Sequence, residues 1–160
     1  MMLGFSNHLL VRPKADGSWD DRDLKDALRA GRLYGAFDSF GTPAGFDFTA
    51  TAGGATKEMG EEVSLASAPV LNAVMPSLRE LDASGDQPVL SLKVLRARAG
   101  GWDEVAAGAA SLSFTPTQPG AYRAEVRIVP THLKKWMSAK AAWIKAERPW
   151  VYSNAIYVVP

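Results

Sequence analysis

Residues 119–128 read Pro119-Gly120-Ala121-Tyr122-Arg123-Ala124-Glu125-Val126-Arg127-Ile128, and apolar and charged side chains alternate along them. The apolar positions after the turn are Tyr122, Ala124, Val126 and Ile128. The charged positions between them are Arg123, Glu125 and Arg127. Successive side chains of an extended chain point to opposite sides, so this alternation predicts a strand with one buried face and one solvent-facing face.

The start of this strand carries a second signal. Gly120 and Tyr122 form a Gly-X-Tyr pattern, which is typical of a tyrosine corner, where the ring points inward and its hydroxyl bonds to nearby backbone. Antibody domains have a cysteine two residues after this tyrosine, whereas this chain has Ala124. We therefore expect a tyrosine corner without a disulfide.

Similar short alternating stretches occur on both sides of residues 119–128. Phe46 and Phe48 alternate with polar neighbours, and Trp150 opens a last stretch that runs to Val159. Further candidate strands lie at residues 33–38, 70–75, 90–94, 102–105 and 112–114. Turn residues separate these stretches, which predicts an all-β fold: an antiparallel, immunoglobulin-like β-sandwich of seven or eight strands. The expected structural residues are Tyr122, Gly120, Phe46, Phe48 and Trp150.

Two helices are expected to interrupt the strands. Leu24, Ala27 and Leu28 recur at helical spacing after two aspartates, which predicts a short amphipathic helix over residues 22–30. A second helical pattern covers residues 131–147, before the last strand, and Arg148-Pro149 ends it. The expected organisation is a linker with the first helix over residues 1–32, and a sandwich over residues 33–160 with a helix insertion at 131–147.

Composition limits the classes of partner. The chain has 160 residues, of which 47% are hydrophobic and 22% charged, and its net charge is +1. These values suit one globular domain with no global field to attract nucleic acid. There is no cysteine, no signal-peptide pattern and no apolar run near the roughly 18–20 residues of a membrane-spanning helix. We expect a cytoplasmic location by default, or one outside the cytoplasm if a parent protein is exported.

No catalytic or metal-binding pattern is evident. His8 and His132 are far apart in the sequence and lack partners at ligand spacing, whereas a zinc site needs three or four ligands. The stretch Asp82-Ala83-Ser84-Gly85-Asp86 begins like a calcium loop, but it lacks the final glutamate and favours a β-turn. The aspartates around residue 22 are better explained by the dipole of the helix that they precede. We therefore predict no catalytic residue, no metal and no cofactor.

The predicted helix at 131–147 is rich in lysine and carries two tryptophans. Its candidate surface or partner contacts are Trp136, Lys140 and Trp143. Such a helix can pack on the sandwich as a lid, with its lysine stems along apolar surface, or it can lie in a membrane interface. The five tryptophans and four tyrosines also allow a sugar-stacking face, although Trp102 and Trp150 lie in strand-like stretches where packing is usual.

Five segments, taken in order, resemble one known family. They are Asp26 to Asp38 (DALRAGRLYGAFD), Pro43 to Phe48 (PAGFDF), Met59-Gly60-Glu61, Pro119 to Val126 (PGAYRAEV) and Arg148 to Val158 (RPWVYSNAIYV). Together they resemble the region after the catalytic barrel in PHP-type metal-dependent phosphoesterases, in the branch of carbaryl-hydrolase-like metallohydrolases. The resemblance covers roughly residues 5–160. The chain departs from the family at Ala155, where the family usually has proline.

The resemblance implies an accessory role. The chemistry of the family belongs to its barrel, whose His and Asp ligands, including a His-X-His motif, have no counterpart in this chain. We therefore expect a non-catalytic β-sandwich module that packs on a PHP-type catalytic domain, in cis or in trans. The apolar run at residues 9–11, with Leu24 and Leu28, is expected to form part of that contact. The alternative is a free-standing binding domain for carbohydrate or a membrane surface.

Overall fold

The computed structural model describes residues 4–137 and 141–160, which are mostly strand with few helices, as predicted. Within these residues the larger sheet contains β1 (Phe5–Leu9), β2 (Leu33–Phe37), β6 (Glu62–Ser64), β9 (Val89–Arg98), β10 (Gly101–Gly108), β12 (Gly120–Val129), β13 (Arg148–Ser153) and β14 (Ile156–Val159). A smaller sheet contains β4 (Asp47–Ala52), β5 (Ala55–Lys57), β7 (Val70–Val74) and β11 (Leu112–Phe114). The strands β3 (Pro43–Ala44) and β8 (Ser77–Leu78) form a separate pair. Short 3-10 turns occur at η1 (Asp38–Phe40), η2 (Leu65–Ser67) and η3 (Thr131–Leu133).

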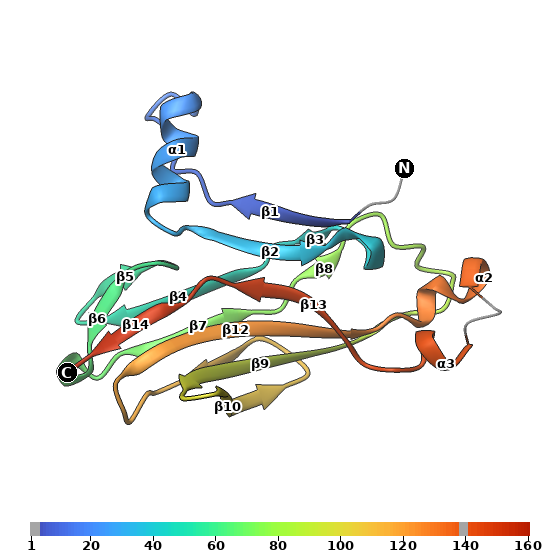
Figure 1. Ribbon diagram of the computed structural model, residues 1–160. Coiled ribbons are helices and arrows are strands. Elements are labelled where there is room, and N and C mark those ends of the chain that lie inside the picture. The colour runs from blue at the N-terminus through green and yellow to red at the C-terminus, as the bar shows by residue number, and fades with distance from the viewer. Residues whose placement is uncertain (1–3, 138–140) are drawn as a thin grey trace.

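β12, the strand predicted from residues 119–128, is the central strand of the larger sheet (Figure 1). β9 pairs with it along one side, and β13 and β14 pair with it along the other. The stretch predicted as one last strand is thus divided, because the ladder stops at Asn154 and Ala155. There the Asn154 side chain accepts a hydrogen bond from the Ala155 amide. β14 then pairs with β6 in parallel, while the other neighbours in the sheet are antiparallel.

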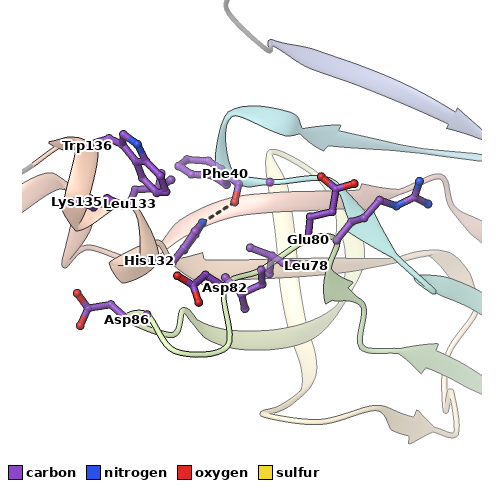
Figure 2. A pocket seen from close by; sticks show the side chains of 13 residues that line it. Phe40, Leu78, Glu80, Asp82, Asp86, His132, Leu133, Lys135 and Trp136 are labelled. Carbon is purple, nitrogen blue, oxygen red and sulfur yellow. Dashed lines mark hydrogen bonds between the residues drawn. The ribbon is translucent and has the colours of Figure 1, made fainter.

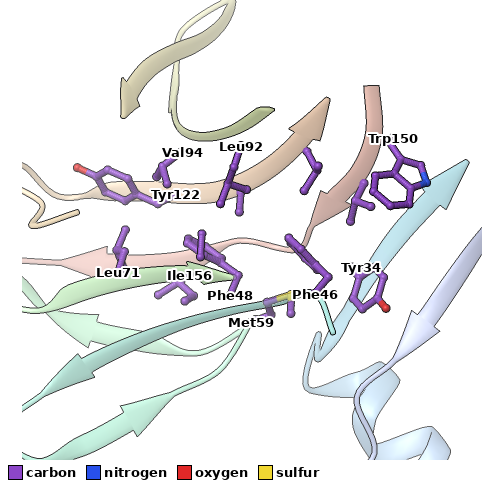
Figure 3. Close-up of a cluster of buried hydrophobic side chains, with 14 of the residues drawn as sticks. Tyr34, Phe46, Phe48, Met59, Leu71, Leu92, Val94, Tyr122, Trp150 and Ile156 are labelled. Carbon is purple, nitrogen blue, oxygen red and sulfur yellow. The ribbon is translucent and has the colours of Figure 1, made fainter. Parts of the chain in front are cut away.

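The two sheets bury their apolar side chains in one core (Figure 3). The predicted inward positions of β12 are all buried: Tyr122, Ala124, Val126 and Ile128. Phe48 of β4 and Leu71 of β7 come from the opposite sheet, and Figure 3 shows them across from Leu92 and Tyr122. The period-2 pattern therefore identified the buried face of this strand correctly.

The residues expected to be structural lie in or against this core. The hydroxyl of Tyr122 donates a hydrogen bond of 2.7 Å to the Gln118 carbonyl, which is the contact expected of a tyrosine corner. Gly120, two residues earlier, has a φ of +153°, a conformation that favours glycine. Phe46 and Phe48 are buried, and the buried Trp150 donates from Nε1 to the Gly41 carbonyl at 2.8 Å.

The other face of β12 corrects one expectation, because Glu125 is only 1% exposed. Arg123 lies on one side of it, with Nη2 at 3.1 Å from the carboxylate, and Arg127 pairs with it from the other side. The Arg123 guanidinium in turn lies 4.0 Å from the ring centroid of Trp102 on β10. The neighbouring side chains therefore cover a position that simple alternation assigns to solvent.

The excursion between β12 and β13 also differs from the prediction. The single helix expected over residues 131–147 is instead the turn η3 followed by two four-residue helices, α2 (Lys134–Met137) and α3 (Ala141–Ile144), which lie side by side (Figure 1). Ile144 is buried, and Trp143 stacks on Phe40 with ring centroids 5.4 Å apart. These contacts draw the segment against the body of the protein. Lys140 lies outside the described residues.

The first helix, α1 (Asp21–Arg29), forms close to its predicted bounds. Asp20 is its N-cap, and Asp20 and Asp23 complete a capping box with each other's backbone amides. A hydrogen bond from Lys14 and two from backbone amides lower the pKa of Asp20 to about 2. The chain leaves the helix through Gly31, whose φ is +72°. The acidic residues at this terminus therefore cap the helix.

Candidate functional site

The base of α1 is fixed to the larger sheet by close backbone contacts. Gly60 approaches so closely that a Cβ at this position would lie 1.9 Å from the Ala30 carbonyl oxygen. Its amide donates to the Ala155 carbonyl at 2.7 Å, and the Asn154 side chain donates to the Gly31 carbonyl at 2.9 Å. Three of the segments that carry the family resemblance thus meet at the C-terminal end of this helix.

An ion-pair network at the same junction ties the chain before α1 to the strands. Arg12 lies 2.9 Å from the Glu58 carboxylate, and Arg32 lies 3.5 Å from it. Leu10 and Arg32 exchange two further hydrogen bonds, one between their backbones and one from the guanidinium. Because β1 also pairs with β2 along its length, the N-terminal elements are held in one position relative to the sheet.

The N-terminal elements nevertheless expose large apolar side chains. Phe5 on β1 is 53% exposed, Trp19 before the helix 60% and Leu28 on the helix 57%. Leu24 is half-buried. Within α1, Ala27 is buried against the protein, so Leu28 and part of Leu24 are the apolar side chains of the helix that the fold leaves uncovered. Figure 1 shows α1 projecting from the sheet beside the edge strand β1. We call Trp19, Leu24 and Leu28 the N-terminal surface.

A pocket of about 540 Å³ lies near α2 (Figure 2). One wall is the chain after β8, which includes Arg79, Glu80 and Asp82, and the other is formed by η3 and α2. The remaining lining residues are Phe40, Gly41, Leu78, Leu81, Gly85, Asp86, His132, Leu133, Lys135 and Trp136. The pocket therefore combines apolar walls with carboxylates, cationic side chains and an indole ring.

His132 is one of the residues that line this pocket. Its Nε2 lies 2.9 Å from the Phe40 carbonyl oxygen, an acceptor, so Nε2 carries the proton. Burial lowers the pKa of His132, which keeps the ring neutral at pH 7. Its other nitrogen, Nδ1, is buried without a hydrogen-bond partner in the described part of the chain. The wall formed by His132 is therefore polar but uncharged.

The loop at residues 82–87 forms the β-turn predicted from its sequence. The Asp82 carboxylate accepts hydrogen bonds from the Ser84 amide and hydroxyl, and these bonds lower the pKa of Asp82. The Gln87 side chain donates to the carbonyls of Asp82 and Gly85, both at 2.9 Å. Across the pocket, Asp86 pairs with Lys134 at 3.6 Å. The loop is thus held to itself and to α2.

The two tryptophans predicted as a surface pair lie in different environments. Trp136 lines the pocket and is 71% exposed. Trp143 is half-buried between Phe40 and the Arg148 guanidinium, which lies 5.4 Å from its ring centroid. Only Trp136 of the two thus presents its ring openly to solvent. The contact of His132 with Phe40 joins positions 92 residues apart, and no local pattern in the sequence indicates it.

Residues 4–137 and 141–160 contain no group of three or more His, Asp or Glu side chains placed to hold a metal ion. Among the helices of these residues, none has both the length and the apolar character needed to cross a membrane. No protein-family model, curated protein or solved structure matches the chain. The resemblance to the post-barrel region of PHP-type phosphoesterases therefore stays a prediction.

Proposed function

We propose that this chain is a non-catalytic, immunoglobulin-like accessory module that docks on a catalytic domain through its N-terminal surface. The strand order supports the immunoglobulin-like assignment: one sheet places β9, β12 and β14 side by side, and β6 runs parallel to β14. The hydrogen bond from Tyr122 to the chain before β12 adds the corner found in such domains.

The observation that carries the docking proposal is the exposure of Trp19, just before α1, and of Leu28 on α1, a helix whose base is fixed. Burying one large apolar side chain contributes about 1.5–3 kcal/mol. A partner that covers several of these exposed side chains together would therefore stabilise the complex. Their positions are also set before binding, by Gly60 and by the ion pairs of Arg12 and Arg32. Because these side chains are already held in place, little conformational entropy is lost when a partner covers them, and this loss is one of the terms that oppose association.

The partner that we propose is a PHP-type metal-dependent catalytic domain. This choice rests on the sequence resemblance, and three of its five segments converge where α1 meets the sheet, at Gly31, Gly60 and Asn154. In this arrangement the module supports the catalytic domain or shapes access to its substrate, while the barrel supplies the metal ligands and the chemistry.

Calorimetric titration tests the proposal. The titrant is the barrel domain of a carbaryl-hydrolase-like metallohydrolase, expressed without its own post-barrel region. We expect saturable binding that the double variant Trp19→Ser/Leu28→Ser weakens by at least about tenfold, corresponding to about 1.4 kcal/mol. Val89→Ser is the matched control, because Val89 is an exposed apolar residue outside this surface, and it should bind like the wild type.

Two results would contradict the proposal. One is equal binding by the wild type and the double variant. The other is metal-dependent phosphatase or phosphodiesterase turnover by the highly purified chain with added Mn²⁺ or Zn²⁺, since the proposal assigns catalysis to the partner.

A further inference from the structure

We propose that the pocket beside α2, here called the Trp136 pocket, binds a neutral saccharide of one or two rings. This inference is independent of the docking proposal. The helix α2, which lines the pocket, and α1 lie at opposite ends of the molecule in Figure 1, so one site can be occupied without covering the other.

The first argument is the exposed indole. A pyranose ring has a face of C–H groups that stacks on a flat aromatic surface, and Trp136 offers such a surface at the pocket. Three other tryptophans do not offer one at this pocket: the Arg123 guanidinium lies over one face of Trp102, Trp143 stacks on Phe40, and Trp150 is buried. Trp19 is exposed but does not line this pocket.

The second argument is the mixture of polar groups. Sugar hydroxyls both donate and accept hydrogen bonds, and the pocket holds both kinds of partner. Glu80 and Asp82 provide acceptors, while Arg79 and Lys135 provide donors. Carboxylates bind hydroxyls through charge-assisted hydrogen bonds, which are stronger than those between neutral groups.

The third argument is charge balance, which disfavours ionic ligands. The lining contains the two carboxylates just named and two cationic side chains, and its third carboxylate, Asp86, is paired with Lys134. His132 adds no charge at pH 7, because burial lowers its pKa. The pocket therefore has little net field to select a phosphate or a polyamine, whereas a neutral polyol needs none.

The fourth argument is size and rigidity. A volume of about 540 Å³ falls within the range of about 300–1,000 Å³ typical of small-molecule sites. The loop wall is fixed by Gln87, whose carbonyl accepts from the Thr131 hydroxyl of η3. In the same wall Glu80 has a φ of +57°, a left-handed conformation that costs free energy for a residue other than glycine. Such strain is concentrated in ligand-binding segments.

Tryptophan fluorescence and calorimetry with a defined panel test the inference. The panel is glucose, galactose, mannose, N-acetylglucosamine, cellobiose, maltose and chitobiose, each titrated into the full chain. We expect saturable binding of at least one member. Trp136→Ala should weaken that binding by about tenfold or more, because it removes the stacking surface.

Asp82→Asn provides a second test. The amide oxygen still accepts the hydrogen bonds of Ser84 that hold the turn, but the charge is lost, so affinity should fall several-fold while the chain stays folded at the assay temperature. Trp102→Ala is the matched control, a tryptophan variant outside the pocket, and should bind the panel like the wild type. Circular dichroism and thermal melting of every variant verify the fold.

Three outcomes would overturn the inference. The first is the absence of saturable binding by every sugar of the panel. The second is binding that Trp136→Ala leaves unchanged. The third is tighter binding of inorganic phosphate, or of vesicles containing an anionic phospholipid, than of any sugar. Loss of sugar binding in Trp136→Ala with intact barrel binding separates this inference from the docking proposal.

Discussion

Replacing Tyr122 tests the packing of the two sheets most sharply, because its ring and its hydroxyl make separable contributions. The ring is buried in the core, and the hydroxyl donates to the Gln118 carbonyl at 2.7 Å. Tyr122→Phe removes one hydrogen bond and should lower the free energy of unfolding by about 0.5–1.5 kcal/mol. Gln118 is exposed, so its carbonyl regains a partner in water. Tyr122→Ala also removes the ring and should cost about 3–5 kcal/mol.

Urea unfolding followed by tryptophan fluorescence measures both changes, and thermal melting provides a second readout. A domain of this size loses about 2–4 °C in melting temperature for each kcal/mol. Tyr157→Ala is the control, because Tyr157 is an exposed tyrosine on the neighbouring strand β14, and it should cost less than about 1 kcal/mol. A loss below about 1 kcal/mol for Tyr122→Ala, or equal losses for both Tyr122 variants, would refute the reasoning.

Three further predictions concern stability and are measured by the same unfolding assays. Glu125→Ala should lower the free energy of unfolding by about 2–4 kcal/mol, because it leaves two guanidinium groups without their buried carboxylate. Glu104 is an exposed partner of an ion pair, and for the control Glu104→Ala the loss should stay below about 1 kcal/mol. Equal losses for the two variants would contradict this account. Gly60→Ala should cost about 1–3 kcal/mol, because its φ is +88° and a Cβ would collide with the Ala30 carbonyl; an unchanged melting temperature would show that the helix base is not tightly packed. The pKa of Asp20 is about 2 in the folded chain and about 3.9 in the unfolded chain. The stabilising contribution of its carboxylate is therefore complete above about pH 4 and is lost as the pH falls from about 4 to about 2. The variant Asp20→Asn should lack this loss of stability in acid.

The alternation of apolar and polar residues predicted the main strands, because the apolar positions of the pattern lie on the buried face of the sheet in the structure. The period-2 pattern of residues 119–128 identified every buried apolar position of β12. It could not identify the burial of Glu125, since the covering groups include Trp102, which approaches through Arg123 from another strand. The helical pattern of residues 131–147 likewise gave no sign of the packing of Trp143 against Phe40, because the two residues are far apart in the sequence.

The Trp136 pocket was only partly foreseeable from the sequence. Trp136 stood out as a candidate surface residue, and the Asp82-containing loop was expected to be a turn. Trp136 and this loop line the same pocket because of the position of η3. A hydrogen bond between His132 and Phe40, which are 92 residues apart in the sequence, fixes that position. By contrast, Leu24 and Leu28 on the N-terminal surface follow directly from helical spacing after a capping residue, and the structure adds the exposed Trp19 just before the helix.

Hydrogen exchange tests the docking proposal most directly. The full chain is measured alone and with saturating barrel domain, and the exchange of its backbone amides is compared peptide by peptide. Docking through the N-terminal surface predicts slower exchange in residues 5–12 and 19–31, with little change in residues 131–137. Unchanged exchange in both N-terminal ranges, or slowing confined to the segment around Trp136, would contradict the proposed mode of docking.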